Sequence, residues 1–299
     1  MTGFLASMRH WPWHILSPVL LFVGIAVFGP WLMPYDPAAQ DYMSTLQGPS
    51  WAHWLGTDYL GRDLLSRLIG GASVSLAAMS IVLASALTIG VIIGSLAGYI
   101  GGRVEVVMIS AIDIALALPS LVIALALIGI MGPGYWSMIV ALTLAWWANY
   151  ARMSRAVVVA ELQAPYIEAA RVMGAGHLHI FFRHILPNVL ALVVVYASAD
   201  AGALVLAIAT LSFLGLGVEP PTPEWGQMLV DGMGYLEDSP ALVILPGLAL
   251  TFVVVSFNLL GEAFALSKIQ RPARGFLLAR RKRARALEEA ARARVETQP

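Results

Sequence analysis

Six long apolar runs constrain the fold of this chain more than any other feature. Each holds about twenty residues or more; they cover roughly residues 15–34, 74–100, 106–131, 135–159, 189–216 and 241–266. About twenty apolar residues are enough for a helix to cross the hydrocarbon core of a bilayer. An open strand would leave backbone groups unpaired in lipid, whereas a helix pairs its own. The sequence therefore predicts an all-α membrane protein, a polytopic bundle of six transmembrane helices.

The composition agrees with this prediction and excludes several kinds of site. The chain is 59% hydrophobic and 12% charged, whereas soluble domains carry about 25% charge. Its formal net charge of zero points to no nucleic-acid partner. Cysteine is absent, which excludes disulfides, thiolate nucleophiles and cysteine metal sites. Neither Lys268 nor Lys282 ends a phosphate-binding loop, so ATP hydrolysis would require another subunit.

Lysine and arginine set the expected orientation. All but two of the 18 are counted on one side of the predicted bundle, including Arg152 and Arg155 near the end of the fourth run, and the two exceptions are Arg62 and Arg67. Cytoplasmic segments carry this kind of excess. Both termini are therefore expected in the cytoplasm, and the protein is expected in a bacterial inner membrane.

This orientation divides the chain into segments. We expect a cytoplasmic N-terminus (1–14), a first transmembrane helix (15–34), an extracytoplasmic segment (35–71), a five-helix core domain (72–266) with a cytoplasmic loop (160–187) and an extracytoplasmic loop (217–240), and a basic cytoplasmic tail (267–299). The first run is expected to remain uncleaved, because the "WLMPYDP" that follows it offers no small-residue cleavage site.

The outer segment carries a helical pattern of its own. Leu60, Leu64 and Leu68 recur every four residues. This spacing predicts an amphipathic helix over residues 58–69 that lies flat on the outer membrane surface. Trp51 and Trp54 suit the lipid interface beside it.

The cytoplasmic loop is polar and predicts two short helices. Pro165 suits the first turn of the first helix, and Glu168 lies near its positive end. Gly174 and Gly176 predict the bend, with a positive φ expected at Gly174. The two apolar faces are expected from two sets of residues: Tyr166, Ala169, Ala170 and Met173 in the first helix, and Leu178, Phe181, Phe182 and Ile185 in the second.

In the second of these helices, Pro187 is expected to mark the turn into the next span. Its three histidines, His177, His179 and His184, are not expected to hold a metal, because His-x-His places two rings about 200° apart on a helix. Periodicity alone favours an ordinary connecting loop over a knob that binds a partner.

The same loop resembles the signature loop of bacterial ABC importer permeases. The matching residues are Glu168, Ala169, Ala170, Gly174, Leu186 and Pro187. The wider chain resembles the second permease of the dipeptide, oligopeptide and nickel class from about Pro34 to Phe264. "LGTDYLGRDLLSRLIGGASVSL" and "LSFLGLGVEPPTPEWGQML" carry the resemblance, whereas the basic C-terminal tail departs from it.

The resemblance implies a type I ABC importer permease fold and a definite set of partners. A homologous second permease would complete the pathway, two ATPase subunits would bind ATP and Mg²⁺, and an extracytoplasmic binding protein would deliver a peptide or related small solute. The helix with Glu168 would couple the spans to one ATPase. No catalytic residue and no cofactor is expected on this chain itself.

Glycines recur every four residues at Gly90, Gly94, Gly98 and Gly102. Such a stripe lets another helix approach closely, and packing within the subunit is the favoured interpretation over contact with the second permease. Pro119 is expected to kink the third span.

Asp113 and Asp200 lie inside apolar runs, where carboxylates are costly. A structural hydrogen-bonding role is favoured over contact with substrate, since no intramembrane cation is identified as a partner. The alternative function is a proton-coupled secondary transporter that uses both carboxylates, but the chain shows no inverted repeat. An intramembrane hydrolase ranks last, because no G-x-S-x-G is present.

Overall fold

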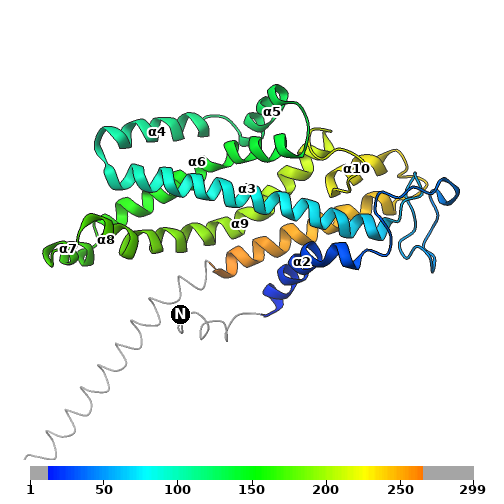
Figure 1. Ribbon diagram of the computed structural model, residues 1–299, viewed down its shortest axis with the longest axis horizontal. Helices are drawn as coiled ribbons and strands as arrows, with labels where there is room; N and C mark the ends of the chain where they lie inside the picture. Colours follow the sequence, from blue (N-terminus) through cyan, green and yellow to red (C-terminus); the bar gives the residue numbers. More distant parts are fainter. Residues whose placement is uncertain (1–12, 265–299) are drawn as a thin grey trace, which may run out of the picture.

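The computed structural model describes residues 13–264, and these form long helices that run along one axis (Figure 1). The helices are α2 (Trp13–Leu32), α3 (Leu64–Ile100), α4 (Gly102–Leu116), α5 (Ser120–Met131), α6 (Tyr135–Leu162), α7 (Pro165–Val172), α8 (His177–Ile180), α9 (Leu186–Phe213), α10 (Trp225–Met233) and a last helix, Ala241–Phe264. A short 3₁₀ turn, η2 (Tyr42–Ser44), and a π-helical turn, η3 (Phe181–Ile185), complete them. The predicted basic tail and most of the N-terminal segment lie outside these residues.

Three helices of the described chain are long and apolar enough to cross a membrane. They are α3, the continuous helix His177–Phe213 and the last helix, Ala241–Phe264. The pair α4 and α5 passes the same test together, but it is bent by 86°. The all-α membrane bundle is thus confirmed, while the count of six spans and the segment boundaries stay predictions.

The bend between α4 and α5 lies at Pro119, as the sequence predicts. α4 ends at Leu116 and α5 begins at Ser120, with Pro119 in an extended conformation between them (φ −56°, ψ 134°). Proline has no backbone N–H to continue the helix, and it disfavours the helical conformation in the residue before it. The third apolar run is therefore divided into two helices.

The core centres on α3 and α6, and glycines allow their close approach. A Cβ on Gly94 would lie 2.1 Å from the carbonyl oxygen of Ala151, and one on Gly90 would lie 2.5 Å from the Cβ of Tyr150. A Cβ on Gly98 would likewise lie 3.0 Å from the carbonyl oxygen of Arg155. Packing within the subunit is confirmed for these three glycines. Gly102 differs, because its φ of +60° serves the turn between α3 and α4.

The predicted flat helix over residues 58–69 is wrong. α3 begins at Leu64 and continues without a break to Ile100, so half of that segment belongs to the long helix. Asp63 caps it, because its carboxylate accepts a hydrogen bond from the Ser66 N–H at 2.8 Å. The polar residues near this point do not face water: Arg67 is only 2% exposed. The leucine spacing was compatible with a surface helix. The segment is buried instead, because Asp58 and Asp231 pair with the Arg67 guanidinium inside the bundle.

Candidate functional site

The first helix of the loop 160–187, α7, forms where the sequence predicts it. Pro165 occupies its first turn, and the exposed Glu168 lies in the first turn as well. A carboxylate in this position is stabilised by the partial positive charge of the helix N-terminus. Ile167 and Ala170 form the buried face. Of the residues on the predicted apolar face, only Ala170 is buried within the subunit, whereas Tyr166, Ala169 and Met173 are exposed.

Gly174 ends α7 with a φ of +84°, which confirms the predicted positive φ. Its N–H donates to the Arg171 carbonyl, and the Ala175 N–H donates to the Ala170 carbonyl, both at 3.0 Å. These two bonds make a Schellman motif, in which a left-handed residue satisfies the last carbonyls of a helix. A side chain at Gly174 would meet open space, so the conformation rather than contact requires glycine.

The second predicted helix is the start of a transmembrane helix rather than a separate element. α8, η3 and α9 form one continuous helix from His177 to Phe213, so Pro187 marks no turn. Pro187 lies in the first turn of α9, and the Leu186 N–H bonds to the Phe181 carbonyl five residues earlier. This π-helical turn adjusts the backbone immediately before the proline, which cannot donate a hydrogen bond. The predicted coupling residues Leu186 and Pro187 therefore lie at the base of a span.

We call the unit from Pro165 to Ile185 the knob, and it is fixed firmly to the bundle. The Tyr99 hydroxyl at the end of α3 donates to the His177 carbonyl at 2.7 Å, and its ring lies 5.0 Å from the ring of Phe181. Buried isoleucines join the knob to the main core: Ile167, Ile180 and Ile185. Movement of the knob should thus be transmitted to the spans.

Tyr166 ties the knob to the ends of two further helices. Its hydroxyl donates to the Glu161 carboxylate and accepts from the side-chain amide of Asn188 at 3.2 Å. Desolvation and the nearby Glu161 carboxylate raise the pKa of Tyr166 to about 12. The phenol therefore stays neutral near pH 7 and keeps its donor role.

The tip of the knob exposes apolar side chains to solvent. Val172 is 84% exposed, Met173 80%, Leu178 74% and Phe182 61%. Glu168 and Arg171 are exposed beside them. In Figure 1, α7 and α8 lie at one end of the bundle, opposite the end that carries α10. An apolar patch with a charged rim, outside the lipid-facing spans, is typical of a surface that contacts another protein.

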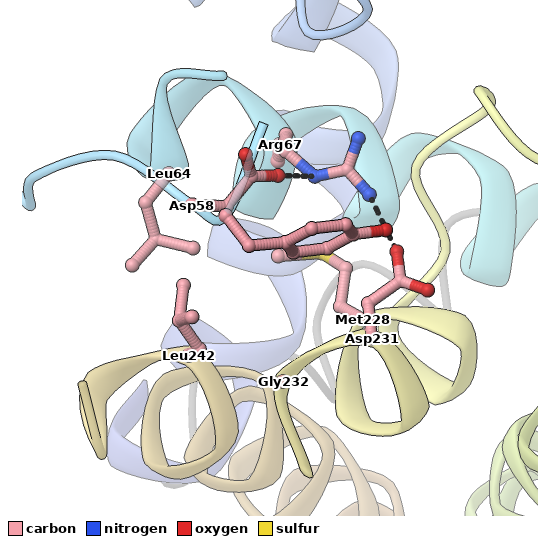
Figure 2. A pocket seen from close by; sticks show the side chains of 8 residues that line it. Asp58, Leu64, Arg67, Met228, Asp231, Gly232 and Leu242 are labelled. Atoms are coloured by element: carbon pink, nitrogen blue, oxygen red, sulfur yellow. Dashed lines mark hydrogen bonds and ion pairs between the residues drawn. The ribbon is translucent and has the colours of Figure 1, made fainter. Parts of the chain in front are cut away.

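The opposite end holds a buried charge network that sequence reasoning missed. The Asp58 carboxylate lies 2.6 Å from Nε of Arg62 and 3.3 Å from Nε of Arg67. Asp231 in α10 lies 3.5 Å from both guanidinium groups. Figure 2 shows Arg67 between the two carboxylates. The signal in the sequence was that Asp58 precedes both arginines within ten residues, in "DYLGRDLLSR".

Glu224, another residue that the sequence did not single out, caps α10. Its carboxylate accepts from the Gln227 N–H at 3.0 Å and from the Ser75 hydroxyl of α3 at 2.8 Å. Burial raises the pKa of the Glu224 carboxyl. A fully buried cap that reaches across to α3 holds the loop 217–240 against the bundle.

The two aspartates inside the spans have different partners. Asp200 accepts a hydrogen bond from the buried Tyr150 hydroxyl at 2.7 Å. Asp113 forms an ion pair with Arg152 at 2.7 Å, so the expectation that no cation could reach it was wrong. The reason is that Arg152 lies well inside helix α6 and not in the loop that follows.

Comparison with known sequences places this geometry in a family. Residues 90–268 match the family described as "Binding-protein-dependent transport system inner membrane component". Residues 16–49 match the N-terminal TM domain of oligopeptide transport permease C. Similar proteins include the nickel transport system permease protein NikC of Escherichia coli K12, 41% identical over 88% of this chain and 95% of that protein. The di/tripeptide transport system permease protein DppC of Pseudomonas aeruginosa UCBPP-PA14 is 42% identical over 82% of each chain.

A solved structure has the same fold at low sequence identity. The chain resembles a chain of the MetNI methionine ABC transporter, solved in an inward-facing conformation, with a TM-score of 0.51 and 21% identity over 67% of this chain and 97% of that one. This likeness supports the predicted type I permease fold. The chain belongs to the family of inner membrane components of binding-protein-dependent transport systems, and it is a transmembrane permease subunit of an ABC importer.

Proposed function

We propose that this permease imports peptides or related small solutes, including nickel chelates, and forms half of the translocation pathway. The names of the relatives support this cargo class: they transport nickel, di- and tripeptides and, in Pectobacterium atrosepticum, glutathione. A homologous second permease would supply the other half, and an extracytoplasmic binding protein would deliver the solute. Two ATPase subunits would bind ATP and Mg²⁺. The alternative function, a proton-coupled secondary transporter, is not favoured, because the family is described as binding-protein-dependent.

The knob is the proposed contact with an ATPase, and its exposed apolar tip is the observation that carries this assignment. Met173 and Leu178 present apolar side chains to solvent, with Glu168 beside them. The matched motif residues have distinct roles in this proposal. Glu168 and Ala169 face the ATPase; Ala170 packs inward, and Gly174 shapes the bend. Leu186 and Pro187 join the knob to its span.

The continuous helix His177–Phe213 offers a direct route for the movement. Its 37 residues extend over roughly 55 Å, since an α-helix rises about 1.5 Å per residue. Near the outer end a Cβ on Gly226 of α10 would lie 2.2 Å from the Ala209 carbonyl oxygen of α9, so the two helices are in backbone contact. When ATP moves the ATPase groove, the displaced knob would tilt α9 and, through it, α10. The ends of the pathway would then open alternately.

Glu168→Ala tests the coupling role. A hydrogen bond to a charged group is worth about 1.5–3 kcal/mol, so ATPase docking should weaken roughly ten- to a hundredfold. The complex should be reconstituted in liposomes with its ATPases and binding protein. Transport and substrate-stimulated ATP hydrolysis should both fall. Glu237→Ala, which removes an exposed carboxylate from the outer loop, is the matched control. Unchanged transport by Glu168→Ala would reduce the knob to a connector.

The orientation is proposed from the charge distribution, with the knob in the cytoplasm and the loop around Thr222 outside. The chain lacks cysteine, so single cysteines can be placed at Thr222 and at Met173, both of which are exposed. In intact cells an impermeant thiol reagent should label Thr222→Cys and leave Met173→Cys unmodified until the cells are lysed. The reverse pattern would contradict the orientation.

A further inference from the structure

The ion pair between Asp113 and Arg152 lies in an unusual setting for charges inside a span. Oδ1 of Asp113 in α4 is 2.7 Å from a terminal nitrogen of Arg152 in α6, yet each side chain is 58% exposed. Nearer the cytoplasm, about one turn along α6 and two turns along α4, Arg155 and Glu105 join the same two helices. Their side chains are more covered, at 35% and 23% exposed. The ion pair between Asp113 and Arg152 thus presents its charges to the surroundings of the subunit.

The depth of the pair places it within the hydrocarbon region. Trp136, which is 68% exposed, lies at the outer start of α6, where aromatic rings favour the membrane interface. Arg152 follows sixteen residues later, roughly 24 Å along the helix, within a hydrocarbon core about 30 Å thick. Asp113 lies roughly 16 Å beyond the inner start of α4 at Gly102. Lipid cannot solvate two exposed charges here without a large cost.

Further polar residues extend the pair into a polar band, which we define as Ser110 and Asp113 on α4 with Asn149 and Arg152 on α6. Within each helix the two residues are three apart and share a face. Apart from the ion pair itself, no hydrogen bond within residues 13–264 reaches the side chain of Asp113 or Arg152, so one carboxylate oxygen and most guanidinium donors remain available. An apolar cover would leave these groups unsatisfied, whereas water or a polar solute would pair with them.

We propose that the polar band lines the water-filled translocation pathway and binds the charged ends of a peptide, with Asp113 facing the ammonium group and Arg152 facing the carboxylate. This proposal rests on the proposed import function. The balanced pair fits a zwitterion, because a solute that separates the two side chains replaces each lost partner with a group of the same charge. A planar guanidinium binds a carboxylate with two parallel hydrogen bonds. Between solutes, the two side chains pair with each other.

Cysteine accessibility tests the pathway assignment without reference to any cargo. Ser110→Cys lies in the polar band, and Ala111→Cys lies at nearly the same depth but 100° further around α4; both positions are exposed. The full complex, without nucleotide and in lipid nanodiscs, is treated with a charged methanethiosulfonate reagent, which reacts with thiolates in water. Ser110→Cys should react at least tenfold faster. Equal rates at the two positions, or no reaction at Ser110→Cys, would overturn the assignment.

Uptake of radiolabelled dialanine tests the substrate class in reconstituted liposomes. The double variant Asp113→Asn and Arg152→Gln should lower the uptake rate at least tenfold while leaving nucleotide-dependent assembly intact. The matched control neutralises the lower pair with Glu105→Gln and Arg155→Gln, and its uptake should change less than threefold. Equal loss in both double variants would overturn a specific role for the polar band. If the unmodified complex imports no dialanine, the peptide class is wrong, and the cysteine labelling still decides whether the band lines the pathway.

Discussion

The two ends of the bundle handle their polar residues in opposite ways. At the end with α10, Asp58, Arg62 and Arg67 are between 1% and 3% exposed, and Asp231 closes the network. At the knob, the apolar Met173 and Leu178 are exposed beside the exposed charges of Glu168 and Arg171. Buried ion pairs hold their geometry because separating them leaves an unpaired charge without water. An exposed apolar tip contributes little to the subunit's own stability and is available to a partner. The difference indicates that the α10 end stabilises the subunit itself, whereas the knob is suited to contact another protein.

The largest effect should follow from breaking the network at the α10 end. Asp58 accepts hydrogen bonds from the backbone N–H groups of Leu60 and Arg62 at 2.9 Å in addition to its ion pairs. Asp58→Ala would remove the nearer carboxylate from two buried guanidinium groups and leave them only Asp231 at 3.5 Å. Breaking a buried ion pair in this way costs about 3–5 kcal/mol. The free energy of unfolding in detergent should fall by about this amount. Asp238→Ala, which removes an exposed carboxylate from the loop after α10 at the same end of the bundle, should change it by less than about 0.5 kcal/mol. Similar values for the two variants would remove the contrast between the ends.

An intermediate effect is expected at the bend of the knob. Gly174→Val forces a β-branched residue into a left-handed conformation, which costs roughly 1–2 kcal/mol or more. The strain should be relieved by displacement of α7, so transport should fall at least tenfold while the subunit stays folded. Gly176→Val is the matched control, because Gly176 has a φ of −70° and open space around it. If both variants transport at the unmodified rate, the shape of the knob does not matter.

The smallest effect on the subunit itself should come from the tip. Met173→Ser and Leu178→Ser alter side chains that are 80% and 74% exposed, so the free energy of unfolding should change by less than about 0.5 kcal/mol. Binding of the ATPase subunits, measured by co-purification and by titration, should nevertheless weaken. A variant such as Ala156→Ser, at an exposed position on α6 away from the tip, should alter neither quantity. Loss of stability without loss of binding would reverse the interpretation of this end.

Much of the architecture could be predicted from the chain alone, because it follows from local rules. Apolar runs of about twenty residues specify helices in lipid whatever surrounds them. Pro119 interrupts a helix because it lacks an N–H, and Gly174 adopts a positive φ because it lacks a Cβ. The resemblance to binding-protein-dependent permeases was likewise visible as a linear pattern, and the family comparison agrees with that resemblance.

Contacts between distant residues decided what periodicity could not. The leucine spacing at residues 60–68 suits a surface helix equally well, but Asp58 and Asp231 provide buried partners for Arg67 and draw the segment into α3. Arg152 was counted with a cytoplasmic loop until α6 placed it opposite Asp113, 39 residues away in the chain. Pro187 was expected to end a helix, yet a π-helical turn carries the backbone past it. Local sequence determines which elements form, whereas the stabilisation of a charge depends on which other charges the packed helices bring within a few ångströms.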